Sequence, residues 1–192
     1  MPDAVEIPID RTIVLVGLMG AGKSCIGRRL AVRLGLPFRD ADAEIESAAG
    51  SSIEDIFELH GEAAFREGEA RVICRLLTGA PHVLATGGGA FMNPDTRAAI
   101  GEAAVSVWLR ADLDLLLKRT GRRNNRPLLK HGDPRKTLSD LMAWRYPIYG
   151  TADLIVDSFD GPPEVTVERV LTALRGRATA AKDPIPVEEA EA

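Results

Sequence analysis

This chain contains the stretch Gly17-Leu18-Met19-Gly20-Ala21-Gly22-Lys23-Ser24, which matches the phosphate-binding pattern G-x-x-x-x-G-K-[ST] at each fixed position. The apolar run at 12–16 before it predicts a buried strand, and residues 25–34 after it predict a helix. Glycines allow the tight turn that points backbone N–H groups at a phosphate, and the helix N-terminus adds partial positive charge. A chance glycine-rich turn would not require both flanking elements, so we expect this loop, the P-loop, to bind a nucleotide.

Two side chains of the P-loop have distinct expected roles. Lys23 is expected to reach the outer phosphates, and the hydroxyl of Ser24 is expected to hold Mg²⁺. Cys25 follows at the start of the helix, where its structural alternative is a small buried filler. The residues expected to contact the nucleotide here are Gly20, Ala21, Gly22, Lys23, Ser24 and Cys25.

Composition limits the class of protein. The 192 residues suit one domain, and 45% hydrophobic with 27% charged residues is typical of a globular protein. The net charge of −4 leaves no general basic surface for nucleic acid. No apolar run approaches the roughly 18 residues that span a membrane, and the acidic start differs from a signal peptide. The two cysteines have no metal-site spacing. We expect a cytoplasmic monomer without nucleic-acid or membrane partners.

Apolar runs alternate with helical patterns along the chain. This alternation predicts an α/β fold, in which a five-stranded parallel sheet is flanked by helices and ligands lie beyond the carboxyl ends of the strands. We expect a single domain at 11–176, a loose N-terminus at 1–10 and a disordered tail at 177–192, which has few apolar side chains. Strands are predicted at 12–16, 36–39, 82–85, 104–109 and 154–156. Helices are predicted at 25–34, 41–49, 53–59, 62–77, 94–101, 112–120, 135–149 and 164–175.

Two aspartates, Asp40 and Asp42, follow the second predicted strand. Short acidic side chains cap helices well, which is the structural explanation. The functional alternative is that Asp40 holds Mg²⁺ through water, while Asp42 accepts a hydrogen bond or a proton from a substrate hydroxyl.

Three consecutive glycines, Gly87, Gly88 and Gly89, follow the third predicted strand. A flexible turn rarely needs all three, because each loses much conformational freedom on folding. Close approach of a ligand to bare backbone is the better explanation.

Arg66 and Arg145 each share a helix face with apolar residues. An arginine on an apolar stripe must reach water or find a partner, so snorkelling or a salt bridge with Glu62 or Glu69 would explain Arg66. The functional alternative is that the two bidentate guanidinium groups capture a substrate carboxylate.

The segment from Lys118 to Lys130 has six basic residues and no acidic one. It could be a solvated charged loop, but its like charges repel and favour an anion such as polyphosphate. We interpret 118–131 as a lid over ATP, in which Arg119 contacts the nucleotide and Arg126 stabilises the transferring phosphoryl group.

Taken together, these motifs resemble the shikimate kinase family over residues 11–175. The resemblance is carried by Gly-Leu-Met-Gly-Ala-Gly-Lys-Ser at 17–24, Phe-Arg-Asp-Ala-Asp at 38–42, Gly-Glu-Ala-Ala-Phe-Arg-Glu-Gly-Glu at 61–69, Ala-Thr-Gly-Gly-Gly-Ala at 85–90, Arg-Pro-Leu-Leu at 126–129 and Arg-Tyr-Pro-Ile-Tyr at 145–149. The P-loop occurs in many families, whereas the whole set in this order is far more specific.

The resemblance implies a P-loop nucleoside-monophosphate-kinase-like fold with strand order 2-3-1-4-5. It also implies transfer of the γ-phosphoryl group of ATP to the 3-hydroxyl of shikimate, a step toward chorismate and the aromatic amino acids, with Mg²⁺ as cofactor. The catalytic residues would be Lys23, Asp42 and Arg126, and the metal residues Ser24 and Asp40. The shikimate-binding residues would be Asp42, Arg66, Gly87, Gly88, Gly89 and Arg145, with both arginines on the carboxylate.

The sequence departs from the family pattern at two places. Cys25 stands where the family usually has threonine, and residues 156–160 contain no arginine for the adenine. Two alternative functions remain open: a kinase for another small polyol acid such as gluconate, and an inactive relative that senses nucleotide.

Overall fold

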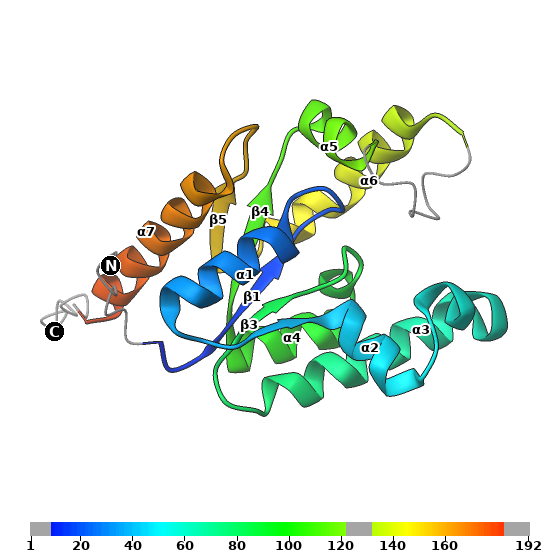
Figure 1. Cartoon of the computed structure of the whole chain (residues 1–192), viewed down its shortest axis with the longest axis horizontal. Coiled ribbons are helices and arrows are strands. Elements are labelled where there is room, and N and C mark those ends of the chain that lie inside the picture. The colour runs from blue at the N-terminus through cyan, green and yellow to red at the C-terminus, as the bar shows by residue number, and fades with distance from the viewer. Residues whose placement is uncertain (1–8, 122–131, 183–192) are drawn as a thin grey trace, which may run out of the picture.

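The computed structural model describes residues 9–121 and 132–182. Its centre is a five-stranded sheet of order β2-β3-β1-β4-β5, in which every pair is parallel (Figure 1). The strands are β1 (Thr12–Val16), β2 (Phe38–Asp40), β3 (Val83–Ala85), β4 (Ala104–Arg110) and β5 (Leu154–Asp157). The predicted parallel sheet and the strand order implied by the resemblance are confirmed.

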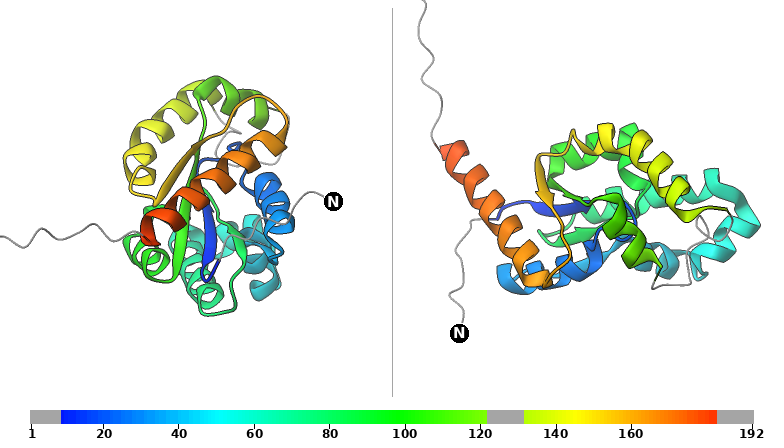
Figure 2. Two further views of the ribbon diagram at one scale, coloured as in Figure 1. Left: turned by 90° about the vertical axis from the view of Figure 1, so that its left-hand side faces the viewer. Right: turned by 90° about the horizontal axis from the view of Figure 1, so that it is seen from above.

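Helices cover both faces of this sheet (Figure 2). On one face α1 packs against α7, and on the other α3 packs against α4. The helices are α1 (Lys23–Leu34), α2 (Ala41–Ala49), α3 (Ile53–Leu77), α4 (Pro94–Ala103), α5 (Leu113–Thr120), α6 (Pro134–Tyr149) and α7 (Pro163–Lys182), with a short 3₁₀ helix at Ala90–Met92. Because it is covered on both faces, β1 is apolar and buried at four successive residues, from Ile13 to Val16.

The break predicted between helices 53–59 and 62–77 lies inside α3. Gly61 has φ 80° and ψ 173°, which is not helical and is a conformation that a side chain disfavours. The helix therefore consists of two arms that meet at this glycine.

The structure differs from the sequence prediction at several element boundaries. The 3₁₀ helix was not predicted, and β2 begins at Phe38 rather than at residue 36. The last helix continues to Lys182, beyond the helix predicted at 164–175 and the domain boundary predicted at residue 176. Residues 177–182 are rich in alanine, which is the strongest helix former. Within the described residues, no helix is both long and apolar enough to cross a membrane.

A polar junction ties the start of β5 to β4 and α7. One carboxylate oxygen of Asp153 accepts hydrogen bonds from the backbone N–H of Ser106 at 2.8 Å and from its hydroxyl at 2.7 Å. The other oxygen accepts from Arg177 Nη1 at 2.6 Å. Burial alone would raise the pKa of Asp153, but the hydrogen bonds from Ser106 and Arg177 outweigh it and hold the pKa below its ordinary value of 3.8.

We expect Asp153→Asn to lower the free energy of unfolding by about 2 kcal/mol at pH 7, because it removes charge-assisted hydrogen bonds. A carboxyl whose pKa is lowered by folding stabilises the protein above its unfolded pKa, and this contribution is lost as the pH falls through the folded pKa. The difference between the two proteins should therefore shrink below about pH 4. Urea unfolding as a function of pH measures it.

Asp157→Asn is the matched control. Asp157 also pairs with an arginine, Arg110, but its side chain is 56% exposed. Exposed ion pairs contribute little, so the loss should stay below about 1 kcal/mol. Equal losses in the two variants would contradict the role assigned to Asp153.

Candidate active site

A cavity of about 640 Å³ opens beyond the carboxyl ends of β1, β2 and β3. Its lining comes from the P-loop, Asp40 at the end of β2, Asp42 in the first turn of α2, the residues after β3, the end of α5 and the loop before α7. The residues that carry the argument below are Gly20, Gly22, Lys23, Ser24, Cys25, Asp40, Asp42, Gly87, Gly88 and Arg119. The P-loop, the two aspartates and the glycines after β3, which the sequence places at strand ends, come together there.

Two glycines shape the P-loop. Gly17 has φ 140°, and a Cβ at this position would lie 2.8 Å from the carbonyl oxygen of Leu109. Gly22 has φ 101° and caps α1 without a side-chain hydrogen bond. The N–H groups of the first turn of α1 therefore face the cavity without a capping side chain, as an anion site at a helix N-terminus requires.

Two basic side chains beside the P-loop, Lys23 and Arg119, bind its backbone carbonyls. Lys23 Nζ donates to the oxygens of Gly17 at 2.7 Å and Leu18 at 3.0 Å. Arg119 donates to the oxygens of Gly20 and Ala21, both at 3.3 Å. Arg119 also donates to Ser158 Oγ at 3.0 Å and to the oxygen of Phe159 at 2.8 Å. It thus joins the P-loop to the segment after β5, at the wall where the sequence predicts a nucleotide contact.

Asp40 combines the structural and functional explanations given for it. Its Oδ1 accepts from the N–H of Asp42 at 3.1 Å, which caps α2, and its Oδ2 accepts from Ser24 Oγ at 2.7 Å. The capping bond fixes the carboxylate, so that its second oxygen faces the P-loop hydroxyl. Among residues 9–121 and 132–182, no group of three or more His, Cys, Asp or Glu side chains could hold a metal alone.

Arginine side chains lie against the bare backbone of two of the three consecutive glycines. A Cβ on Gly89 would lie 2.4 Å from Arg66 Nη1, which real side chains essentially never allow. A Cβ on Gly88 would lie 3.3 Å from Arg145 Nη1. Both predicted arginines therefore converge on the predicted glycines, from α3 and α6.

Glu69 is a site residue that sequence reasoning considered only as a partner of Arg66. Its side chain is 3% exposed, and its Oε2 accepts from Arg66 Nη1 at 2.7 Å. A Cβ on Gly87 would lie 2.8 Å from Glu69 Oε1 and 3.1 Å from Asp42 Oδ1, so both carboxylates face this glycine. Burial raises the pKa of Glu69, and the hydrogen bond from Arg66 opposes the shift. The i,i+3 spacing of Arg66 and Glu69 is the signal that could have identified it.

The salt-bridge alternative for Arg66 is therefore confirmed, although it does not remove the guanidinium from the site. Arg66 pairs with Glu69 and, at 3.4 Å, with Glu62, while its side chain stays 28% exposed and lies over Gly89. Pairing on one side orients the group, so that its remaining N–H groups can meet a ligand.

Arg145 is more deeply enclosed. The residue is 6% exposed, and its Nε has no hydrogen-bond partner among the described residues. A buried guanidinium N–H without a partner is costly, so this group is suited to an anionic ligand.

Two further expectations concern the nucleotide end. Cys25 is exposed and lines the cavity, so the buried-filler alternative is wrong, because the residue sits on the open side of α1. Arg126 and residues 122–131 of the expected lid lie outside the described residues.

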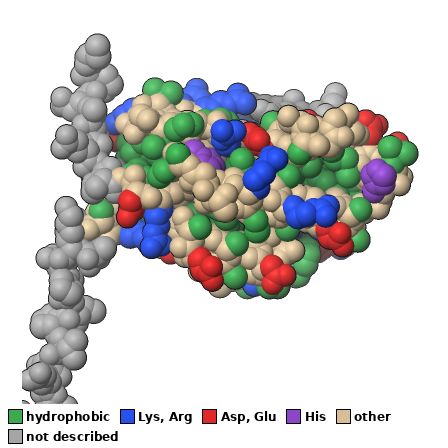
Figure 3. Space-filling view, turned by 90° about the horizontal axis from the view of Figure 1, so that it is seen from below, with side chains coloured by type: hydrophobic (Ala, Val, Ile, Leu, Met, Phe, Trp, Pro, Cys, Tyr) green, Lys and Arg blue, Asp and Glu red, His purple; other side chains and the backbone are tan. Residues whose placement is uncertain are grey.

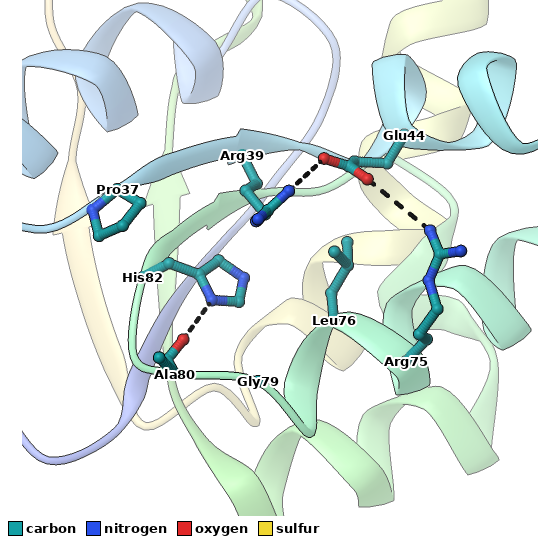
Figure 4. A pocket seen from close by; sticks show the side chains of 8 residues that line it. All are labelled: Pro37, Arg39, Glu44, Arg75, Leu76, Gly79, Ala80 and His82. Carbon is teal, nitrogen blue, oxygen red and sulfur yellow. Dashed lines mark hydrogen bonds and ion pairs between the residues drawn. The ribbon is translucent and has the colours of Figure 1, made fainter.

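A second hollow, drawn in Figure 4, lies beside β2 and the start of β3. Its two arginines, Arg39 and Arg75, share Glu44 at 2.8 and 3.7 Å, so their charge is already compensated. The His82 ring is bound to the carbonyl of Ala80 at 3.0 Å. On the face shown in Figure 3, acidic and basic side chains are interspersed rather than gathered by sign. We therefore assign phosphate chemistry to the P-loop cavity.

Comparison with known proteins identifies the family of this chain. The family model described as shikimate kinase matches residues 19–175. The chain belongs to the shikimate kinase family. It is 68% identical to a shikimate kinase of Paramagnetospirillum magneticum over 86% of this chain and 85% of the relative. It is 62% identical to that of Caulobacter vibrioides, over 86% and 82%. The resemblance seen in the sequence is thus confirmed.

Solved structures give the same family. Shikimate kinase from Acinetobacter baumannii, in complex with shikimate, superposes with a TM-score of 0.85 at 36% identity, over 91% of this chain and 98% of that one. A gluconokinase from Sinorhizobium meliloti, with a TM-score of 0.56 and 21% identity, shares the fold alone.

Proposed function

We propose that this chain transfers the γ-phosphoryl group of ATP to the 3-hydroxyl of shikimate, giving shikimate 3-phosphate and ADP. The observation that carries the proposal is the convergence of Arg66 and Arg145 on glycines beside the P-loop cavity. Two guanidinium groups next to a phosphate site are suited to a substrate that is itself a small carboxylic acid.

At the nucleotide end, the chain would stabilise the negative charge of the ATP phosphates. The N–H groups from Gly20 to Cys25 surround the phosphates, and Lys23 leaves its carbonyl partners to reach the outer ones. Arg119 holds the wall of the cavity beside the nucleotide. Phosphoryl transfer passes through a loose transition state, so positioning and charge stabilisation supply most of the catalysis.

At the substrate end, the proposed roles follow from the geometry around the triple glycine. Arg66 and Arg145 bind the shikimate carboxylate, and the bare backbone of Gly87, Gly88 and Gly89 lets the ring approach. Asp42, in the first turn of α2, orients the 3-hydroxyl toward the γ-phosphate and accepts its proton.

The cation that a P-loop kinase requires is proposed to be Mg²⁺. The donor set fits it, since Ser24 Oγ and the carboxylate of Asp40 are oxygen ligands 2.7 Å apart, and Mg²⁺ usually completes its shell with phosphates and water. Ser24 would hold the ion directly and Asp40 through water. When bound, the ion neutralises charge developing between the β- and γ-phosphates.

Arg126 is proposed as the arginine that stabilises the transferring group, on the basis of the resemblance and the basic composition of 118–130. We further infer a monomer that acts in the cytoplasm. Gel filtration with light scattering tests the first inference, and fractionation of cells tests the second.

A coupled ADP-release assay tests the function directly. We expect turnover with shikimate and not with gluconate, and gluconate should not compete with shikimate. Absence of shikimate turnover above the ATPase background would reject the proposal. Nucleotide binding without turnover of either acid would favour the sensing relative.

Removing either carboxylate-binding arginine should weaken shikimate binding selectively. We expect Arg66→Ala and Arg145→Ala each to raise the KM for shikimate by about 10- to 100-fold, the value of a charge-assisted hydrogen bond, while the KM for ATP changes little. Arg71→Ala is the matched control, because Arg71 is exposed on the same helix as Arg66. An unchanged KM in both arginine variants would remove these residues from the site.

The metal assignment predicts a shift in Mg²⁺ dependence. Chelation should abolish turnover, and added Mg²⁺ should restore it. Ser24→Ala should raise the Mg²⁺ concentration for half-maximal activity by about tenfold, because one coordinating oxygen is lost. Ser24→Thr keeps the hydroxyl and should stay near the parent value. If Ser24→Ala titrates like the parent, Ser24 is not a ligand.

A further inference from the structure

The hydroxyl of Tyr149 lies at the meeting point of two predicted substrate groups. Tyr149 is the last residue of α6 and is 0% exposed. Its hydroxyl donates to the carbonyl oxygen of Gly88, and Nη1 of Arg145, one helical turn earlier, lies 3.3 Å from the position that a Cβ on Gly88 would occupy. The tyrosine hydroxyl and the arginine predicted to bind the carboxylate therefore meet at the same glycine.

This hydroxyl keeps its proton at neutral pH. Burial raises the pKa of Tyr149 to about 12, although Arg145 opposes the shift. The group can thus serve as a donor to the Gly88 carbonyl. Because this bond is buried, it constrains the position of that carbonyl.

Gly88 is where the substrate end meets the nucleotide end. A Cβ built on Gly88 would lie 3.3 Å from Arg145 Nη1 and 3.6 Å from both the oxygen of Gly17 and the nitrogen of Met19. A small movement of Gly88 would therefore change the spacing between the arginine and the P-loop. A reacting hydroxyl and phosphate tolerate little such change.

We propose that Tyr149 is a positioning residue for the acid substrate. Its hydroxyl holds the Gly88 carbonyl, and thereby the backbone against which Arg145 lies, at a fixed spacing from the P-loop, and it acts through this backbone without touching the reacting atoms. The inference rests on the proposed function, since it assumes that Arg145 binds the shikimate carboxylate.

A purely structural role is the competing explanation, because Tyr149 belongs to an aromatic cluster. Its ring centroid lies 5.8 Å from that of Trp108, 6.2 Å from Tyr146 and 6.5 Å from Phe91. Phenylalanine would preserve this packing and remove only the hydroxyl. Tyr149→Phe therefore separates the two explanations.

The chain offers a matched control in its only other tyrosine, Tyr146. Tyr146 lies on the same helix and in the same cluster, and its hydroxyl also donates to a backbone carbonyl, that of Ala111 after β4. Tyr146→Phe thus loses a similar bond that does not involve the substrate groups.

The experiment compares shikimate and ATP kinetics in the two variants, at a temperature where circular dichroism shows both folded. We expect Tyr149→Phe to raise the KM for shikimate by about tenfold and leave the KM for ATP within about twofold, since one buried hydrogen bond is lost on the substrate side only. Tyr146→Phe should leave both values near those of the parent. Equal effects of the two variants, or parallel changes in both KM values, would overturn the inference.

A spectroscopic measurement does not depend on activity. In the Tyr146→Phe chain, 3-fluorotyrosine incorporation labels position 149 alone, and its ¹⁹F resonance should move on adding shikimate. An unmoved resonance at saturating shikimate would count against the inference. Failure of the parent chain to phosphorylate shikimate would instead overturn the proposed function, and the inference with it.

Discussion

The close approach of charged side chains to bare backbone at residues 87–89 is the constraint on which the rest of this structure depends. Arg66, Arg145 and the carboxylates of Glu69 and Asp42 reach these three positions from three different helices. A single methyl group on Gly89 would occupy the place of the Arg66 guanidinium. The loop after β3 therefore fixes where α2, α3 and α6 must lie relative to the central strands.

The same arrangement explains how charges are kept in a largely enclosed place. Glu69 is buried, and Arg66 compensates its charge through a direct hydrogen bond. Burying such a pair is costly, and removing one partner would leave an uncompensated charge. The pair orients Arg66, because Glu69 binds its guanidinium on one side. The Nε of Arg145 has no hydrogen-bond partner among the described residues. The arginine side chains are thus oriented in the absence of any bound acid.

Much of the fold could be predicted because its signals are local. The P-loop pattern, the apolar run from Ile13 to Val16 and the alternation of strands with helices predict a parallel sheet, and Gly61 marks the break in α3. The contact of Tyr149 with Gly88 could not be found in this way, and the sequence indicated Glu69 only as a partner of Arg66. Periodicity shows which helix face a residue occupies, but the partner of that face, such as the carbonyl of Gly88 for Tyr149, is set by tertiary packing. The end of α7 was missed because alanine extends a helix without an apolar stripe.

The broken helix α3 has a mechanical consequence. Gly61 interrupts the backbone ladder, and both Arg66 and Glu69 lie on the arm that follows it. The preceding arm is joined to the arginine through the torsions of Gly61 and a ring contact between Phe57 and Phe65, whose centroids lie 4.6 Å apart, rather than through a continuous helix. A change in the direction of the first arm can therefore be taken up at Gly61 without bending the helical segment that carries Arg66 and Glu69.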